Sequence, residues 1–350
     1  MNKFFVLCVV VFAFSLSASA EIKYTITDLG TLGGSSSQAF GINSSGQVVG
    51  WAWNQGNSDQ YAFLYSNGVM QNLGDLSAQG QRPGSFAYGG INDNGQITGI
   101  GDLHAFFYSN GVMHDVGTLN GGPRSAGQAI NNKGQVVGYS WTPDNVSHAF
   151  LYSNGSMQDL GSNSITAYGI NDSGQIVGQL NTNVPQHAFL YSNGVMQDLG
   201  TISGPNSIAT GINNIGQIVG WTDIDNSQNT HAALWQDGSI LDLGSLGGHS
   251  YAMAINNNAE IVGNALTDRG TKAFLYSDGV MEDLNNLIDP ALNWSLTSAQ
   301  SINDTGQIVG YGVEPFGQQH AFLLTPITIV PEPTTLFPFS LTVLVLLRRR

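Results

Sequence analysis

Charged residues are scarce in this 350-residue chain, and basic ones are the scarcest: only 10% of residues are charged, and 10 Lys and Arg stand against 24 Asp and Glu. Nucleic-acid binders contact phosphates through many Lys and Arg side chains, so we expect no nucleic-acid partner. Cysteine is almost absent, because Cys8 is the only one and lies in a segment that we expect to be removed. We therefore expect neither a disulfide nor thiol chemistry in the mature protein. Helical periodicity is absent throughout.

Apolar residues, by contrast, are plentiful. The chain is 41% hydrophobic and 10% aromatic, which is enough to build a core and argues against disorder. Length alone would suggest two domains, but all-β rings of this size often form one.

The first 20 residues have the pattern of a secretory signal peptide. Lys3 supplies a basic start, residues 4–16 form an apolar run, and Ala18-Ser19-Ala20 is a small-residue cleavage site. We expect cleavage before Glu21. The alternative is an uncleaved membrane anchor, which the short run and the Ala-x-Ala site disfavour.

The other end carries a motif, an apolar run over residues 334–347 and a basic cluster. The motif is Pro331, Glu332 and Pro333, and the cluster is Arg348, Arg349 and Arg350. The run is shorter than the roughly 20 residues of a membrane helix, but its flanks suit one, with the Arg cluster in the cytoplasm. This end resembles the PEP-CTERM sorting signal of bacteria that make exopolysaccharide, although Pro338 is unusual within the run. The resemblance implies processing by an exosortase and a protein at the cell surface or outside the cell, transiently anchored in the membrane by its tail.

Between these ends, one unit recurs seven times. Its first element is typified by Gly41-Ile42-Asn43-Ser44-Ser45-Gly46-Gln47-Val48-Val49-Gly50, and its Asn recurs every 39 to 49 residues at Asn92, Asn131, Asn171, Asn213, Asn256 and Asn303. A second element, His-Ala-Phe-Leu-Tyr-Ser-Asn-Gly-Val-Met, is clearest at 187–196, and an Asp-Leu-Gly element follows it.

Each unit contains four short strand signals. Asn-x-x-Gly joins the first two, and Asn-Gly, the strongest two-residue hairpin signal, joins the last two. A four-stranded meander of about 40 residues in seven copies predicts an all-β, seven-bladed β-propeller. The alternative is a β-solenoid.

The two ends of the repeat array complement each other. The last unit stops after His320–Leu324 and lacks its fourth strand, whereas residues 21–30 supply a strand that ends in Asp-Leu-Gly. We expect this N-terminal strand to close the ring, which removes exposed strand edges. The propeller would then occupy residues 21–325, and residues 326–333 would be a linker with the Pro-Glu-Pro motif.

The loops divide into two classes. In an antiparallel meander, the first and third connections share one face and the remaining connections share the other. Here the first and third connections are uniform tight turns. The variable loops all fall on the opposite face and include 54–60, 75–85, 120–124, 223–229 and 287–296. Variable loops on a rigid scaffold commonly carry binding sites, so we expect the site there.

The repeat pattern over residues 28–324 resembles the HAF-repeat extracellular proteins, named for the His-Ala-Phe seen at 148–150 and 187–189. Departures are Ala233 in the fifth unit and Tyr61 and Lys272 in place of the His. The resemblance implies architecture and an extracellular location, and it supplies no catalytic residues.

Repeated polar residues are interpreted as scaffold. Five His share one repeat position, namely His104, His148, His187, His231 and His320. Equivalent positions on separate blades lie too far apart for one metal ion unless they are near the axis, so we expect each His to hydrogen-bond within or between blades. The segments 92–95 and 171–174 hint at Ca²⁺, but turn chemistry explains them. Asp223 and Asp225, in a variable loop, are slightly better candidates for an ion, and we expect no cofactor.

Aromatic residues near the end of the second strand point toward the variable face: Trp51, Trp53, Tyr139, Trp141, Trp221 and Tyr311. They could stack on sugar rings, or they could pack between blades. No catalytic motif is present, so we expect a non-enzymatic exported protein that binds exopolysaccharide or another matrix component. The alternatives are a glycan-active hydrolase or lyase, which needs an asymmetric acid cluster, and a protein–protein adhesion module.

Overall fold

The computed structural model describes residues 22–76, 84–161, 165–181, 185–227 and 229–328. The expected signal peptide, the Pro-Glu-Pro motif, the apolar run and the Arg cluster lie outside these residues. Among the described residues, none of the helices is long and apolar enough to cross a membrane.

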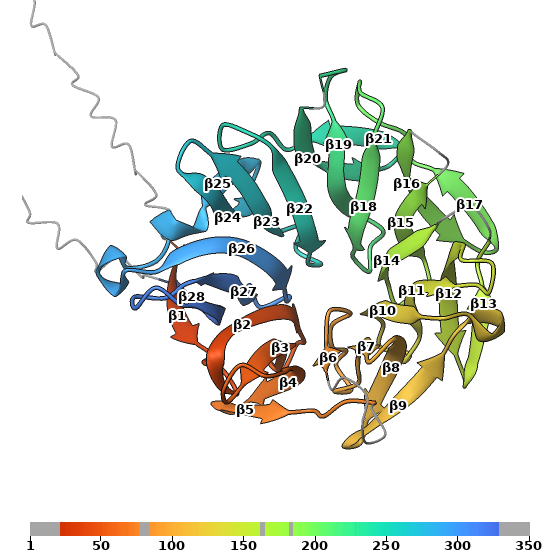
Figure 1. Ribbon diagram of the computed structural model, residues 1–350. Coiled ribbons are helices and arrows are strands. Elements are labelled where there is room, and N and C mark those ends of the chain that lie inside the picture. Colours follow the sequence, from red (N-terminus) through yellow and green to blue (C-terminus); the bar gives the residue numbers. More distant parts are fainter. Residues whose placement is uncertain (1–21, 77–83, 162–164, 182–184, 228, 329–350) are drawn as a thin grey trace, which may run out of the picture.

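Seven four-stranded antiparallel sheets form a ring, so the predicted seven-bladed β-propeller is confirmed (Figure 1). Blade one contains β2 (Gly33–Ile42), β3 (Val48–Asn54), β4 (Gln60–Ser66) and β5 (Val69–Asn72). Blade two contains β6 (Ser85–Phe86), β7 (Ile97–Gly101), β8 (His104–Ser109) and β9 (Val112–Gly117). Blade three contains β10 (Ser125–Ile130), β11 (Val136–Trp141), β12 (Ser147–Ser153) and β13 (Ser156–Asp159). Blade four contains β14 (Thr166–Ile170), β15 (Ile176–Asn181), β16 (Gln186–Ser192) and β17 (Val195–Asp198).

The remaining blades repeat this order. Blade five contains β18 (Ser207–Ile212), β19 (Ile218–Asp223), β20 (Thr230–Gln236) and β21 (Ser239–Asp242). Blade six contains β22 (Ser250–Ile255), β23 (Ile261–Thr267), β24 (Gly270–Ser277) and β25 (Val280–Asp283). Blade seven contains β26 (Ser295–Ile302), β27 (Ile308–Val313), β28 (Gln319–Thr328) and β1 (Ile22–Asp28). Three short 3-10 helices lie in connections: η1 (Leu119–Gly121), η2 (Leu284–Asn286) and η3 (Pro290–Leu292).

The N-terminal strand closes the ring, as the complementary ends predict. β1 pairs antiparallel with β28 from Ile22↔Thr328 to Asp28↔Phe322. The backbone N–H of Tyr24 also donates to the carbonyl of Leu287, 2.9 Å away. This closure satisfies an edge that would otherwise be open, and it excludes the β-solenoid.

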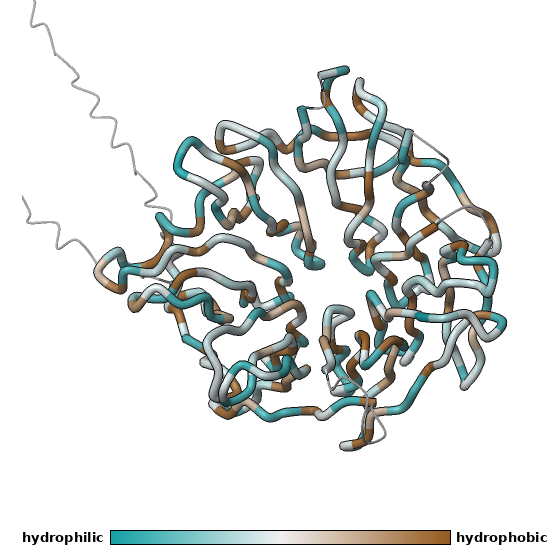
Figure 2. Tube along the Cα trace, viewed as in Figure 1, coloured by the Kyte–Doolittle hydropathy of each residue, from teal (hydrophilic) through white to brown (hydrophobic). Residues whose placement is uncertain are grey.

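The core lies between neighbouring blades. Six blades place a phenylalanine from the third strand in a fully buried position: Phe63, Phe106, Phe150, Phe189, Phe274 and Phe322. Burying such a side chain contributes roughly 1.5–3 kcal/mol. Figure 2 shows hydrophobic segments distributed around the whole ring instead of concentrated in one blade, and each of the buried clusters combines residues of adjacent blades. Each blade is therefore stabilised mainly by its neighbours.

The glycine that ends Gln-Val-Val-Gly is required by close packing. A Cβ at Gly178 would lie 2.0 Å from the carbonyl oxygen of Thr166 and 2.9 Å from the Phe189 ring. The first strand is irregular opposite this glycine, because the register between β14 and β15 shifts between Ala167 and Gly169. The repeat glycine thus lets the first strand and the core phenylalanine approach the second strand.

Candidate functional site

The antiparallel order separates two faces of the ring. The connections between first and second strands and between third and fourth strands form what we call the turn face. The other connections form what we call the loop face. All the loops of variable length therefore lie on the loop face. Ile22 and Thr328, the two ends of the described chain, are paired at the turn face.

The turn face is built around a closed ring of hydrogen bonds. The side-chain amide of each repeat asparagine donates to the backbone carbonyl of the corresponding asparagine in the next blade, over 2.8 to 3.2 Å. These ring asparagines are Asn43, Asn92, Asn131, Asn171, Asn213, Asn256 and Asn303. The last bond runs from Asn303 to the carbonyl of Asn43 and completes the circle.

Each ring asparagine also shapes its own turn. Asn171 Oδ1 accepts from the backbone N–H groups of Ser173 and Gln175, at 3.1 and 3.0 Å. The segments 92–95 and 171–174, in which the sequence hinted at Ca²⁺, form two of these turns. Partial burial acts to raise the pKa of Asp93, but hydrogen bonds from the Ser44 backbone and the Asn132 side chain lower it overall. Turn chemistry accounts for these oxygen-bearing residues.

The five repeated histidines each contact a carboxylate of their own blade. Their Nδ1 atoms lie 2.7 to 2.9 Å from an aspartate at the end of the fourth strand. The pairs are His104–Asp115, His148–Asp159, His187–Asp198, His231–Asp242 and His320–Asp28. The interpretation of these histidines as hydrogen-bonded scaffold is thus confirmed. Within the described part of the chain, no group of three or more His, Cys, Asp or Glu side chains could hold a metal ion.

The predicted aromatic residues do not form one surface. Trp51 is only 8% exposed and packs edge-on against Phe86 of blade two, with 6.1 Å between ring centroids. Arg124 lies over the Trp141 ring at 4.1 Å. Trp53, Tyr139 and Tyr311 are half-buried. Several of the predicted aromatic side chains are therefore engaged in contacts within the propeller.

Trp221 and Asp223 lie in a cleft on the loop face, where blades four, five and six meet. The cleft has a volume of about 500 Å³, within the range of small-ligand sites. Its lining residues are Gln186, Asn206, Trp221, Asp223, Thr230, His249 and Tyr251. The rings of Trp221 and Tyr251 meet edge to face, with centroids 5.9 Å apart, so one aromatic wall faces a group of polar side chains.

The Asp223 carboxylate is 2% exposed and fixed by its neighbours. Asn206 Nδ2 donates to Oδ2 at 2.8 Å, and the Thr230 hydroxyl donates to Oδ1 at 3.2 Å. The backbone N–H of Thr230 donates to His249 Nδ1 at 3.1 Å, so this imidazole accepts at Nδ1 and presents a proton at Nε2. The polar groups of the cleft are therefore held in set orientations.

Asp225 does not line the cleft. Its carboxylate accepts from the Asn229 side chain at 2.6 Å and from the Ser227 backbone at 2.7 Å. The hydrogen bond from the Asn229 side chain is the main reason that the pKa of Asp225 is lowered. Asp225 thus fixes Ser227 and Asn229 of its own loop, and the structure does not bring it together with Asp223.

Sequence reasoning missed five of the cleft residues: Gln186, Asn206, Thr230, His249 and Tyr251. They come from three blades and lie up to 65 positions apart on the chain, so no local motif joins them. One available signal was His249, because it and His114 are the only two of the seven His outside the repeated position.

No family model and no curated protein matches this chain. Among solved structures, one described as YCF48 bound to D1 peptide is 11% identical, with a TM-score of 0.53, over 89% of this chain and 97% of that one. TolB from Acinetobacter baumannii is 12% identical, with a TM-score of 0.43, over 76% of each chain. A Mycobacterium tuberculosis puromycin-hydrolyzing peptidase is 11% identical, with a TM-score of 0.49, over 77% of this chain, which spans only 47% of the peptidase. At these identities the similarity concerns the fold alone.

Proposed function

We propose that this chain is an exported, non-enzymatic propeller that binds a polysaccharide of the cell surface or extracellular matrix through the cleft on its loop face. The observation that carries the proposal is the cleft itself, in which the Trp221–Tyr251 wall stands beside oriented amide, carboxylate, hydroxyl and imidazole groups. Sugars present apolar ring faces and many hydroxyls, and this combination complements both.

A binding role is favoured over hydrolysis by the acid content of the cleft. Glycoside hydrolases generally use two carboxyl groups on either side of the scissile bond. Of the residues that line this cleft, Asp223 alone has a carboxylate, and its oxygens already accept from Asn206 and Thr230. The proposal of export rests on the leader at 1–20 and on the tail that resembles a sorting signal.

The test uses the chain from Glu21 to Thr328, which contains every strand of the propeller. Replacing Trp221 by Gln, the residue that blade four carries at the equivalent position as Gln179, removes the aromatic wall with a side chain that the fold accepts. We expect saturable binding of the wild type to the host exopolysaccharide, measured by calorimetry, and at least tenfold weaker binding of Trp221→Gln.

The matched control is Tyr311→Gln, which makes a similar change at the equivalent position of blade seven, outside the cleft. It should bind like the wild type, with and without a chelator. If the folded wild type bound no polysaccharide, the proposal would fail and a protein partner would take its place. Loss of binding with the chelator would instead point to a calcium-dependent site.

A further inference from the structure

The residue type changes from blade to blade at the position where the chain lies nearest the axis of the ring. Just before each ring asparagine lie a small residue and an isoleucine, as in Gly169-Ile170. The residue preceding this pair differs from blade to blade: it is Phe40, Gln128, Tyr168, Thr210, Met253 or Gln300, with Tyr88 in blade two, where an additional glycine follows. Scaffold positions repeat in this chain, whereas the residue type at this position, where the register between the first and second strands shifts in six blades, is not repeated.

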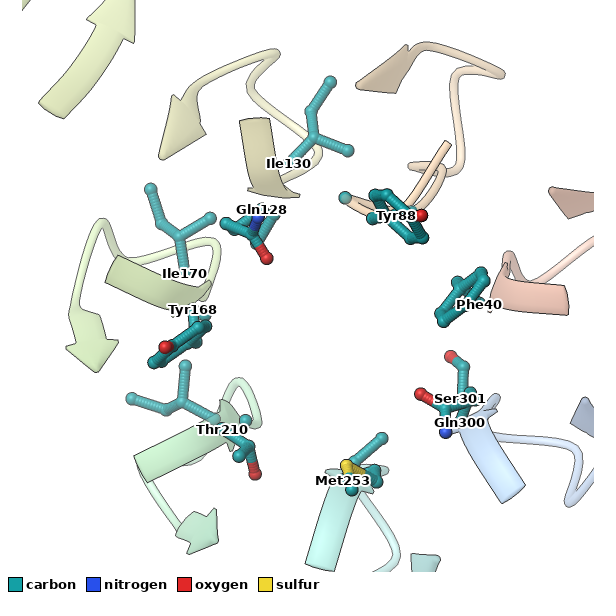
Figure 3. A pocket seen from close by; sticks show the side chains of 18 of the residues that line it. Phe40, Tyr88, Gln128, Ile130, Tyr168, Ile170, Thr210, Met253, Gln300 and Ser301 are labelled. Carbon is teal, nitrogen blue, oxygen red and sulfur yellow. The ribbon is translucent and has the colours of Figure 1, made fainter. Parts of the chain in front are cut away.

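These side chains surround a cavity of about 570 Å³ on the axis of the ring. Figure 3 shows them around the open centre, with Phe40 and Tyr88 on one side and Tyr168 on the opposite side. The lining residues include aromatic, amide and hydroxyl groups, but none of the described residues that line the cavity carries a charged side chain. A neutral ligand is therefore favoured.

Phe40 and Tyr88 line one wall of the cavity and belong to a continuous aromatic series, whose other members, Phe86 and Trp51, do not line it. The Phe40 and Tyr88 rings meet edge to face at 5.0 Å, and Tyr88 stacks on Phe86 at 5.2 Å with an interplanar angle of 2°. Phe86 then contacts Trp51 at 6.1 Å. Burial raises the pKa of both Tyr88 and Tyr168, so their phenols are neutral hydrogen-bonding groups at physiological pH.

The cavity is reached along the axis, because residues of all seven blades form its wall. Six isoleucines line it on the side of the ring asparagines. Beyond them, a smaller cavity of about 210 Å³ lies within the ring asparagines. A chain-like ligand would therefore enter such a site with one of its two ends. A polymer bound by its middle would need an open groove instead.

We infer that the axial cavity is a second binding site, which takes the terminal residues of an uncharged glycan chain. Stacking on Tyr88 and Tyr168 and hydrogen bonds to Gln128 and Gln300 would hold the sugars. This inference rests on the proposed function for the chemical class of its ligand, a glycan, and it concerns a cavity separate from the cleft.

The experiment again uses residues 21–328 and exploits the repeat for its variants. Tyr168→Thr places in blade four the residue that blade five carries as Thr210, so the fold should tolerate it. The probes are neutral hexasaccharides of glucose, xylose, mannose and N-acetylglucosamine, with an acidic galacturonate hexamer for comparison. Binding is measured by calorimetry, and thermal unfolding checks that each variant is folded.

We expect one or more neutral hexamers to bind, and Tyr168→Thr to weaken that binding at least tenfold. Tyr311→Gln, at a position that lines neither the axial cavity nor the cleft, should leave hexamer binding unchanged. For the same sugar, a long polymer should bind in proportion to its number of chain ends.

Three results would overturn the inference: no neutral hexamer binds, the acidic hexamer binds as well as the neutral ones, or Trp221→Gln abolishes hexamer binding while Tyr168→Thr does not. The last result would leave the cleft as the glycan site and would therefore spare the proposed function. Failure of polymer binding alone, with hexamer binding intact, would reject the cleft and retain the axial site.

Discussion

At the scale of single residues, the ring asparagines and the aspartates that pair with histidine differ in burial and in what they contact. Asn171 is 3% exposed, and its amide joins its own turn to the next blade. The Asp198 side chain is 52% exposed, although it contacts His187 at 2.7 Å. The repeat marks both positions as structural. It predicts the Asn-x-x-Gly turn, but not the bond from Asn171 to Asn213, because that contact spans 42 residues of sequence.

Because of this difference in burial, we expect Asn171→Ala and Asp198→Ala to lower the unfolding free energy by unequal amounts. Asn171→Ala leaves the buried carbonyl of Asn213 and two partly buried N–H donors of its own turn without partners. An unpaired buried group costs about 1–3 kcal/mol, so we expect a loss of roughly 2–4 kcal/mol in unfolding free energy. Asp198→Ala removes an exposed pair and should cost less than about 1 kcal/mol. Chemical denaturation of both variants provides the comparison, and equal losses would contradict the assigned role of the asparagine ring.

At the scale of the strand, blade five shows compensation within one face. Ala233 occupies the place of the core phenylalanine, and Trp235, two residues later on the same face, occupies the place of a tyrosine. Both are buried, at 0% and 4% exposure. Trp235 Nε1 has no hydrogen-bond partner among the residues that the structure describes, as expected of a side chain selected for volume. The sequence reveals the departure at Ala233, but only packing shows which side chain fills the space.

A double-mutant cycle tests this compensation. Ala233→Phe alone adds a ring to a filled space and should destabilise the blade by about 1–3 kcal/mol. Adding Trp235→Tyr restores the pair that the other blades carry, so the double variant should recover most of that loss. Thermal and chemical unfolding of the single and double variants give the coupling energy, and additive effects would show that the two positions do not share one space.

The closing strand is also testable, because Cys8 is the only cysteine and lies outside residues 21–328. Thr25 and Thr325 are register partners on β1 and β28, and partners in antiparallel strands have Cα atoms about 4.5–5.5 Å apart, which suits a disulfide. The pair Thr25→Cys and Thr325→Cys should form a disulfide on oxidation and raise the unfolding temperature relative to the reduced form. Free-thiol titration and non-reducing electrophoresis measure this, with each single variant as control. Thiols that stay free in the folded protein would show that the ring is not closed by this strand.

At the scale of the whole molecule, the sequence is sufficient for the architecture because all seven blades carry the repeat asparagine and the second-strand glycine, and six of them carry the core phenylalanine. The complementary ends likewise predict the closing strand. The cleft could not be predicted, because Gln186, Trp221 and Tyr251 meet only when three blades are assembled. Asp223 and Asp225 are separated by one residue in the sequence, yet Asp223 lines the cleft and Asp225 fixes its own loop. The axial position was visible as variation before the Ile-Asn pair, but variation in the loops is more conspicuous than variation inside a strand.

Because Ile22 and Thr328 are paired on the turn face, both ends of the described chain leave the propeller on the side opposite the cleft. A tether attached at either end pulls on the face opposite the variable loops, so molecules held side by side on a support would all point their clefts outward. A long polymer with repeated sugars could then bridge several neighbours at once, and weak individual contacts would add up to durable adhesion through avidity.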